Sequence, residues 1–250
     1  MFTRKEVTDG LGRAISCLGL SDWYLILHYK RFKKIICSLS KQTARGASGL
    51  EIGAWPGYLG LSLKNLGYKV TGTDLEPERL GDLGIPVVKL NLNSEVIPFA
   101  DNSFEFVVFS EVVEHLQSDR VISALKEINR VLVPGGVLVI STPNKTRLGA
   151  IFHNEKHPAS EHGHGHEKEY RLDEIVRLMN EIQMIIVSAQ TVSLYAGVGR
   201  EETNKYYYPL IDFMWHPRMV SNFAKTLLYP LLKFVPQFRD SLLIVARKEL

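Results

Sequence analysis

The chain has 250 residues, of which 45% are hydrophobic and 23% charged, and its formal net charge is +3. This length suits one domain with a full core, or one domain with an appendage. Two cysteines, Cys17 and Cys37, exclude a disulfide framework and a cysteine zinc site. No apolar run reaches the roughly 18 residues of a spanning helix, and no secretory signal is visible, so we expect a reduced, cytoplasmic protein.

Charge is unevenly distributed along the chain. Residues 1–45 carry nine Lys/Arg against three Asp/Glu, and residues 205–239 carry five against one. The stretch between them, 46–204, carries fourteen against twenty-one. The basic ends are compatible with an anionic partner, such as a membrane surface or a phosphorylated substrate, or with solvated lysine-rich faces.

Apolar runs alternate with amphipathic segments through the middle of the chain. The expected strands are 49–54, 68–74, 85–92, 104–110, 137–142, 184–192 and 241–248. The expected helices are 58–67, 120–132 and 171–182, with a Pro-Gly-Gly turn at 134–136. This order predicts a doubly wound, seven-stranded, mostly parallel α/β sheet of the Rossmann-like type.

Two segments flank this sheet in a single predicted domain, 1–250. Residues 1–45 are expected to form a helical cap, and 195–239 an insertion between the sixth and seventh strands. No internal repeat or low-complexity tract is present.

In such sheets, ligands bind at the carboxyl ends of the strands. The glycine turn 53–57 follows the first strand and Asp74 the second, 21 residues past Gly53. A carboxylate at that spacing accepts hydrogen bonds from ribose hydroxyls, in dinucleotide-binding enzymes and in enzymes that bind S-adenosylmethionine. A dinucleotide loop would have glycine where Trp55 stands, and Glu51 would oppose a pyrophosphate, whereas it suits a cationic amino acid group.

Four motifs occur in a recognisable order. They are "LEIGAWPG", "VTGTDLEPE", "VIPFADNSFEFVVFSEVVEHL" and "ALKEINRVLVPGGVLVISTPN". Together they resemble the class I S-adenosylmethionine-dependent methyltransferases, in particular the small-molecule branch that includes the ubiquinone-biosynthesis type. The resemblance covers roughly 48–192 and the last strand.

The resemblance implies S-adenosylmethionine as cofactor and assigns roles to particular positions. Glu51 would organise the loop and the methionine amino group, Asp74 would hold the ribose, and Ser110 and Glu111 would face the methionine end and the substrate. The residues implied to contact the cofactor are Glu51, Gly53, Ala54, Trp55, Gly57, Asp74, Leu75, Asn91, Leu92 and Ser110.

Trp55 departs from the glycine that the family commonly has in this loop. If the position needed a positive φ, tryptophan would cost about 1 kcal/mol or more. Either Trp55 forms a wall of the cofactor pocket, or the site is closed and the chain is an inactive methyltransferase-like module.

Methyl transfer from a sulfonium requires mainly alignment, with a general base for some oxygen or nitrogen acceptors. The candidate catalytic residues are Glu111, His115 and His166. His115 is a candidate base or a structural histidine. His166 and Tyr170 match a His-x-x-x-[Tyr/Phe] element that the family commonly has before the helix at 171.

The segment 152–170 contains five histidines. It is interpreted as a substrate-side loop, a solvated polar loop, or a metal site formed by His162, His164 and His166 with nearby glutamates. Because nothing in the sequence fixes the geometry of these side chains, we assign no metal-ligating residue.

Aromatic and basic residues are dense in 205–239 and in 21–41. These segments are interpreted as core or dimer packing, or as a lid that forms a hydrophobic acceptor pocket or contacts a membrane surface. No RNA-binding motif is present, so no nucleic acid partner is expected.

The sequence predicts a methyltransferase that acts on an O, N or C atom of a small-molecule, lipid-linked or glycan-precursor acceptor. An inactive binding module is the first alternative. A nicotinamide-dependent oxidoreductase is the second, and the incomplete glycine pattern and the "RVLVPGG" block argue against it.

Overall fold

The computed structural model describes residues 3–18, 23–80, 84–147, 165–192 and 241–250. The α-helices are α1 (Arg4–Leu18), α2 (Trp23–Leu39), α3 (Tyr58–Asn65), α4 (Val121–Val131) and α6 (Leu172–Glu181). The strands are β1 (Ser48–Ile52), β2 (Lys69–Asp74), β3 (Val87–Lys89), β4 (Phe104–Ser110), β5 (Leu132–Pro143), β6 (Met184–Val192) and β7 (Ser241–Lys248). Short 3-10 helices are η1 (Pro77–Leu80) and η2 (Val113–His115).

The strands form one sheet in the order β3-β2-β1-β4-β5-β7-β6. The pairs among β1 to β5 are parallel, and β7 runs antiparallel to both of its neighbours. The chain turns from β1 outward to β3 and then returns to β4 beside β1. The switch in strand order therefore lies between β1 and β4, where ligands bind in sheets of this type.

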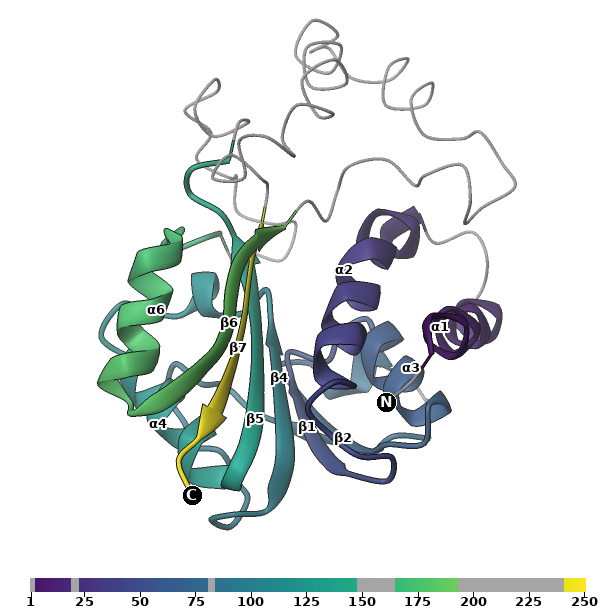
Figure 1. Cartoon of the computed structure of the whole chain (residues 1–250), viewed down its shortest axis with the longest axis horizontal. Coiled ribbons are helices and arrows are strands. Elements are labelled where there is room, and N and C mark those ends of the chain that lie inside the picture. The colour runs from purple at the N-terminus through teal and green to yellow at the C-terminus, as the bar shows by residue number, and fades with distance from the viewer. Residues whose placement is uncertain (1–2, 19–22, 81–83, 148–164, 193–240) are drawn as a thin grey trace, which may run out of the picture.

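Helices cover both faces of the sheet (Figure 1). One apolar cluster packs α4 and α6 against one face, and a second packs α1, α2 and α3 against the other. The central strands are apolar on both sides because each side chain row lies under helices. This confirms the predicted doubly wound, mostly parallel sheet, and the structure adds that β7 is the antiparallel strand.

The N-terminal segment is helical, as predicted for 1–45. Phe32, Ile35 and Ile36 of α2 are buried in the cluster against the sheet. These apolar side chains are therefore not available for the membrane contact proposed for 21–41. No helix in the part of the chain that the structure describes has the length and apolarity needed to cross a membrane.

Two predicted elements differ from those observed. The third strand is limited to Val87–Lys89, since the backbone of 91–95 turns immediately afterwards with N–H groups of Ser94 and Glu95 bonded to the Asn91 carbonyl. The Pro-Gly-Gly sequence does not separate two elements. It lies inside β5, where the register with β4 shifts between Phe104 and Phe106.

The predicted insertion 195–239 and most of the histidine-rich segment, 148–164, lie outside the described residues. The single-domain organisation of 1–250 stays a prediction.

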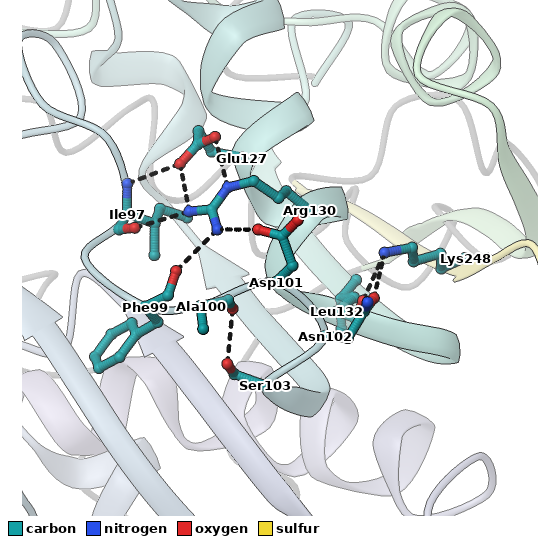
Figure 2. A network of polar contacts seen from close by, with 10 residues as sticks. All are labelled: Ile97, Phe99, Ala100, Asp101, Asn102, Ser103, Glu127, Arg130, Leu132 and Lys248. Atoms are coloured by element: carbon teal, nitrogen blue, oxygen red, sulfur yellow. Dashed lines mark hydrogen bonds and ion pairs between the residues drawn. The ribbon is translucent and has the colours of Figure 1, made fainter.

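Two of the sequence motifs are connected by a network of hydrogen bonds and ion pairs around Arg130 on α4 (Figure 2). Its guanidinium donates to the carbonyl oxygens of Ile97 and Phe99, both at 2.9 Å, and to the carboxylates of Asp101 and Glu127. Hydrogen bonds from Arg130 lower the pKa of Glu127. The "VIPFADNSF" and "RVLVPGG" blocks are thus joined by one side chain, away from the carboxyl edge of the sheet.

Replacing Arg130 with leucine should lower the free energy of unfolding by about 1–3 kcal/mol, because several polar groups lose a charged donor. Cofactor affinity should be unchanged. Urea unfolding combined with cofactor titration measures both quantities, and a loss of affinity without a loss of stability would give Arg130 a functional role instead.

Candidate active site

The predicted site residues come together at the carboxyl edge of the sheet. Gly53 follows β1, Asp74 ends β2 and Ser110 ends β4. β1 pairs with β2 on one side and with β4 on the other, so the three positions are neighbours. This is the switch point of the sheet.

The turn after β1 uses glycine where the backbone requires it. Gly53 and Gly57 have φ values of 74° and 91°, a region that other residues rarely adopt. A Cβ at Gly53 would lie 2.5 Å from Cγ2 of Val112. Trp55 is not among the residues with positive φ, so it causes no strain of this kind. Its side chain is 41% exposed, which is compatible with a wall of the cofactor pocket.

Asp74 connects the glycine turn to the end of β2. Its Oδ2 accepts a hydrogen bond from the backbone N–H of Trp55 at 2.8 Å, and its Oδ1 accepts one from Glu76 at 3.0 Å. A carboxylate has about four acceptor positions, so these two bonds orient the group and leave capacity for ribose hydroxyls.

Glu51 lies beneath the same turn and is 5% exposed. Burial, and then the neighbouring Asp74 carboxylate, raise its pKa to about 8, while a hydrogen bond from the Gly60 backbone opposes the shift. A Cβ at Gly60 would lie 2.4 Å from Oε2 of Glu51, so glycine is needed there for close approach. A buried acid of this kind is suited to pairing with a cationic ligand group.

The residues expected around the adenine differ in how exposed their side chains are. Leu75 is 40% exposed beside Asp74, as an apolar contact for a ligand requires. Asn91 is exposed, and its Oδ1 accepts a bond from the backbone of Asn93. Leu92 is buried in the core, so only its backbone could meet an adenine.

Polar side chains cluster around Glu111, where β4 and β5 end. Glu111 has a φ of 56°, which is uncommon for a residue with a side chain. Its carboxylate accepts a bond from the Ser141 hydroxyl at 3.0 Å and pairs with the Arg31 guanidinium at 3.2 Å. Ser110 and Ser141 lie within hydrogen-bond distance at 2.9 Å. Strained backbone held by buried partners is typical of functional positions.

A second group of titratable side chains follows Glu111 along the chain. Glu114 and His115 lie on η2, and His166 approaches from the segment before α6. Burial, and then the Glu111 carboxylate, raise the pKa of Glu114, which accepts a bond from Thr142 at 3.0 Å. These three residues could hold a metal, since one ligand atom from each lies within 4.8 Å of the others.

Sequence reasoning missed several members of this site. The sequence places Arg31 only in a basic, aromatic segment, and a lone arginine on a helix gives no signal of its buried partner. Ser141 and Thr142 end the fifth strand, and the carboxyl-end rule could have found them. Glu114 lies within the fourth-strand motif, and the sequence alone assigns it no role.

A sequence model described as a methyltransferase domain matches residues 26–189, more than half of the chain. The chain belongs to the methyltransferase-domain family. The seven-stranded sheet with its reversed β7 is the class I fold of S-adenosylmethionine-dependent methyltransferases, which confirms the predicted family and fold.

Two curated relatives of this methyltransferase-family chain illustrate the similarity. A probable S-adenosylmethionine-dependent methyltransferase of Mycolicibacterium smegmatis is 24% identical over 177 residues, covering 70% of this chain and 65% of the relative. A ubiquinone biosynthesis O-methyltransferase of Xanthomonas oryzae pv. oryzae is 33% identical over 109 residues, covering 40% and 45%. The chain aligns with 39% to 65% of the length of curated relatives such as these.

Solved methyltransferase structures share the fold. An S-adenosylmethionine-dependent methyltransferase from Archaeoglobus fulgidus superposes with a TM-score of 0.57 and 16% identity, over 91% of this chain and 100% of that one. At this identity the likeness concerns the fold alone.

Proposed function

We propose that this chain is an active methyltransferase that transfers the methyl group of S-adenosylmethionine to an acceptor that is a small molecule or is attached to a lipid or glycan precursor. The observation that carries the proposal is the pairing of a turn whose positive-φ positions are both glycine with two acidic side chains, Glu51 and Asp74, at the switch point.

We assign the proposed cofactor contacts from the positions of these residues at the carboxyl edge of the sheet. Asp74 and Leu75 would bind the ribose and the adenine, and Glu51 would pair with the methionine amino group. Gly53, Ala54, Trp55 and Gly57 would form the wall of the methionine site, with Asn91 and the backbone of Leu92 at the adenine and Ser110 at the methionine end. Glu111, held by Arg31 and Ser141, would orient the methyl donor and acceptor.

The reaction is a single displacement. A lone pair on the acceptor forms a bond to the methyl carbon while the carbon–sulfur bond breaks and its electrons stay on sulfur. The sulfonium becomes the neutral thioether of S-adenosylhomocysteine, and an acceptor that carried a proton releases it. The protein contributes mainly alignment of acceptor, methyl group and sulfur.

Replacing Asp74 with alanine should weaken S-adenosylmethionine binding by about 1–3 kcal/mol, the range for lost hydrogen bonds to a charged group. Asp119→Ala, at an exposed position after η2, is the matched control and should bind like the wild type. Calorimetric titration of both variants tests the proposal, and equal affinities would remove Asp74 from the cofactor site.

Replacing His166 with alanine should lower turnover at least tenfold and leave cofactor affinity within twofold of the wild type, because His166 lies by Glu114 and His115 rather than at the glycine turn. Transfer of a labelled methyl group to an acceptor found in a compound screen measures turnover. Unchanged turnover would place His166 outside the acceptor site.

A further inference from the structure

Glu114, His115 and His166 form a compact cluster beside the proposed methyl-transfer site. One potential ligand atom from each lies within 4.8 Å of the other two. The two imidazole rings lie edge to face, with centroids 4.9 Å apart. Three ligand atoms bound to one ion at about 2.1 Å lie at most about 4.2 Å apart, so small side-chain rotations close the cluster around a metal.

Each side chain of the cluster is oriented by a second group. His115 Nδ1 lies 3.3 Å from the Gly165 carbonyl oxygen, and His166 Nδ1 lies 3.4 Å from Glu169 Oε1. Metal-binding histidines are typically held in this way, with one ring nitrogen on a carbonyl or carboxylate and the other on the metal.

The supporting groups are themselves fixed. Glu169 pairs with Arg147 at 2.5 Å, and the two side chains are only 17% and 13% exposed. Glu114 is 1% exposed, and its Oε2 accepts a bond from Thr142. A backbone hydrogen bond of 2.8 Å from Glu167 to the Glu114 carbonyl holds the His166 segment against η2.

We propose that Glu114, His115 and His166 bind a divalent transition-metal ion, through one carboxylate oxygen and Nε2 of each histidine. Two histidines and one glutamate are the protein ligands of many zinc sites and, with open positions, of ferrous sites. Imidazole ligands favour such ions over magnesium or calcium, which prefer oxygen. A bound cation would also give the buried Glu114 carboxylate the positive partner that a buried charge requires.

The position of the ion would determine which chemical group the acceptor presents at the site. This part of the inference rests on the proposed function. Glu114 follows Glu111 by three residues, and Thr142 follows Ser141, the partner of Ser110 and Glu111. Three protein ligands leave coordination positions open. The acceptor would therefore present an oxygen to the ion next to the transferred methyl group.

Titration of metal-free full-length protein with Mn²⁺, by calorimetry, and with Co²⁺, by visible absorption, tests the site. One ion per chain is expected. His166→Ala and Glu114→Gln should each weaken binding at least tenfold, and Glu169→Gln should weaken it about 10–100-fold through the loss of histidine orientation. His166 is partly exposed, so this variant should fold even if Glu114→Gln does not.

The variant His162→Ala/His164→Ala is the control for other histidines and should bind the ion like the wild type. Absence of binding to the wild type, equal binding by His166→Ala, or loss of binding only in the control would overturn the proposal. Titration of the same samples with S-adenosylhomocysteine separates the two inferences. Cofactor binding without metal binding refutes the metal site alone, and metal binding without cofactor binding refutes the proposed function alone.

Discussion

Arg31→Met should lower the free energy of unfolding by about 3–5 kcal/mol, the range found when one partner of a buried ion pair is removed. The Arg31 side chain is 5% exposed and that of Glu111 is 15% exposed, with 3.2 Å between Nη1 and Oε2. Methionine fills a similar volume but leaves the carboxylate without its guanidinium partner, while the Ser141 hydroxyl still donates to it. Urea unfolding of the purified variant measures the change.

Lys34→Met is the control on the same helix, because Lys34 is exposed, and it should change stability by less than about 0.5 kcal/mol. The double variant Arg31→Met/Glu111→Gln should recover part of the loss, since it no longer contains a carboxylate that has lost its guanidinium partner. If Arg31→Met is as stable as Lys34→Met, or if the two substitutions in the pair are additive, the ion pair does not stabilise the site as we describe.

The affinity for S-adenosylmethionine should rise about tenfold between pH 6 and pH 7. With a pKa of about 8, Glu51 is mostly protonated in the free protein over this range. A cationic amino group favours the carboxylate, so binding releases a proton, and binding that releases a proton strengthens as pH rises. The α-amino group of the ligand, with an ordinary pKa of about 7.7–8.0, remains charged in this window.

Glu51→Gln should lose this pH dependence and should bind about 1.5–3 kcal/mol more weakly at pH 7, the value of a charged hydrogen bond. Glu181→Gln, at an exposed position that ends α6, is the matched control and should keep the wild-type profile. Calorimetry in two buffers of different ionisation enthalpy should detect about one released proton for the wild type. A flat profile for the wild type, or the same profile for Glu51→Gln, would contradict a role for Glu51 in binding the amino group.

The fold could be predicted because its signals are local and repeated. Apolar runs such as 104–110 and amphipathic spacing such as 121–131 indicate their elements without tertiary information. The predicted turn at the Pro-Gly-Gly sequence is wrong because a glycine with positive φ occurs both in turns and in strand irregularities, and only the pairing with β4 distinguishes the two.

The residues proposed for the cofactor side could also be picked out from the sequence, because Glu51 and Asp74 lie at the carboxyl ends of their strands and Gly53 follows β1. The residues on the acceptor side were harder to predict from the sequence. The partnership of Arg31 with Glu111 joins residues 80 positions apart, and that of His115 with His166 joins residues 51 positions apart. Such contacts depend on how helices pack on the sheet, and no local pattern encodes them.

Calorimetric titration of the purified wild-type chain with S-adenosylmethionine and S-adenosylhomocysteine, with NAD as the control, tests the central claim most directly. We predict micromolar binding of the first two ligands and none of NAD, with Trp55 accommodated at the edge of the pocket. Binding of neither methionine-derived ligand would mean that the turn from Gly53 to Gly57 is closed to the cofactor, and the chain would then be a binding module rather than a methyltransferase.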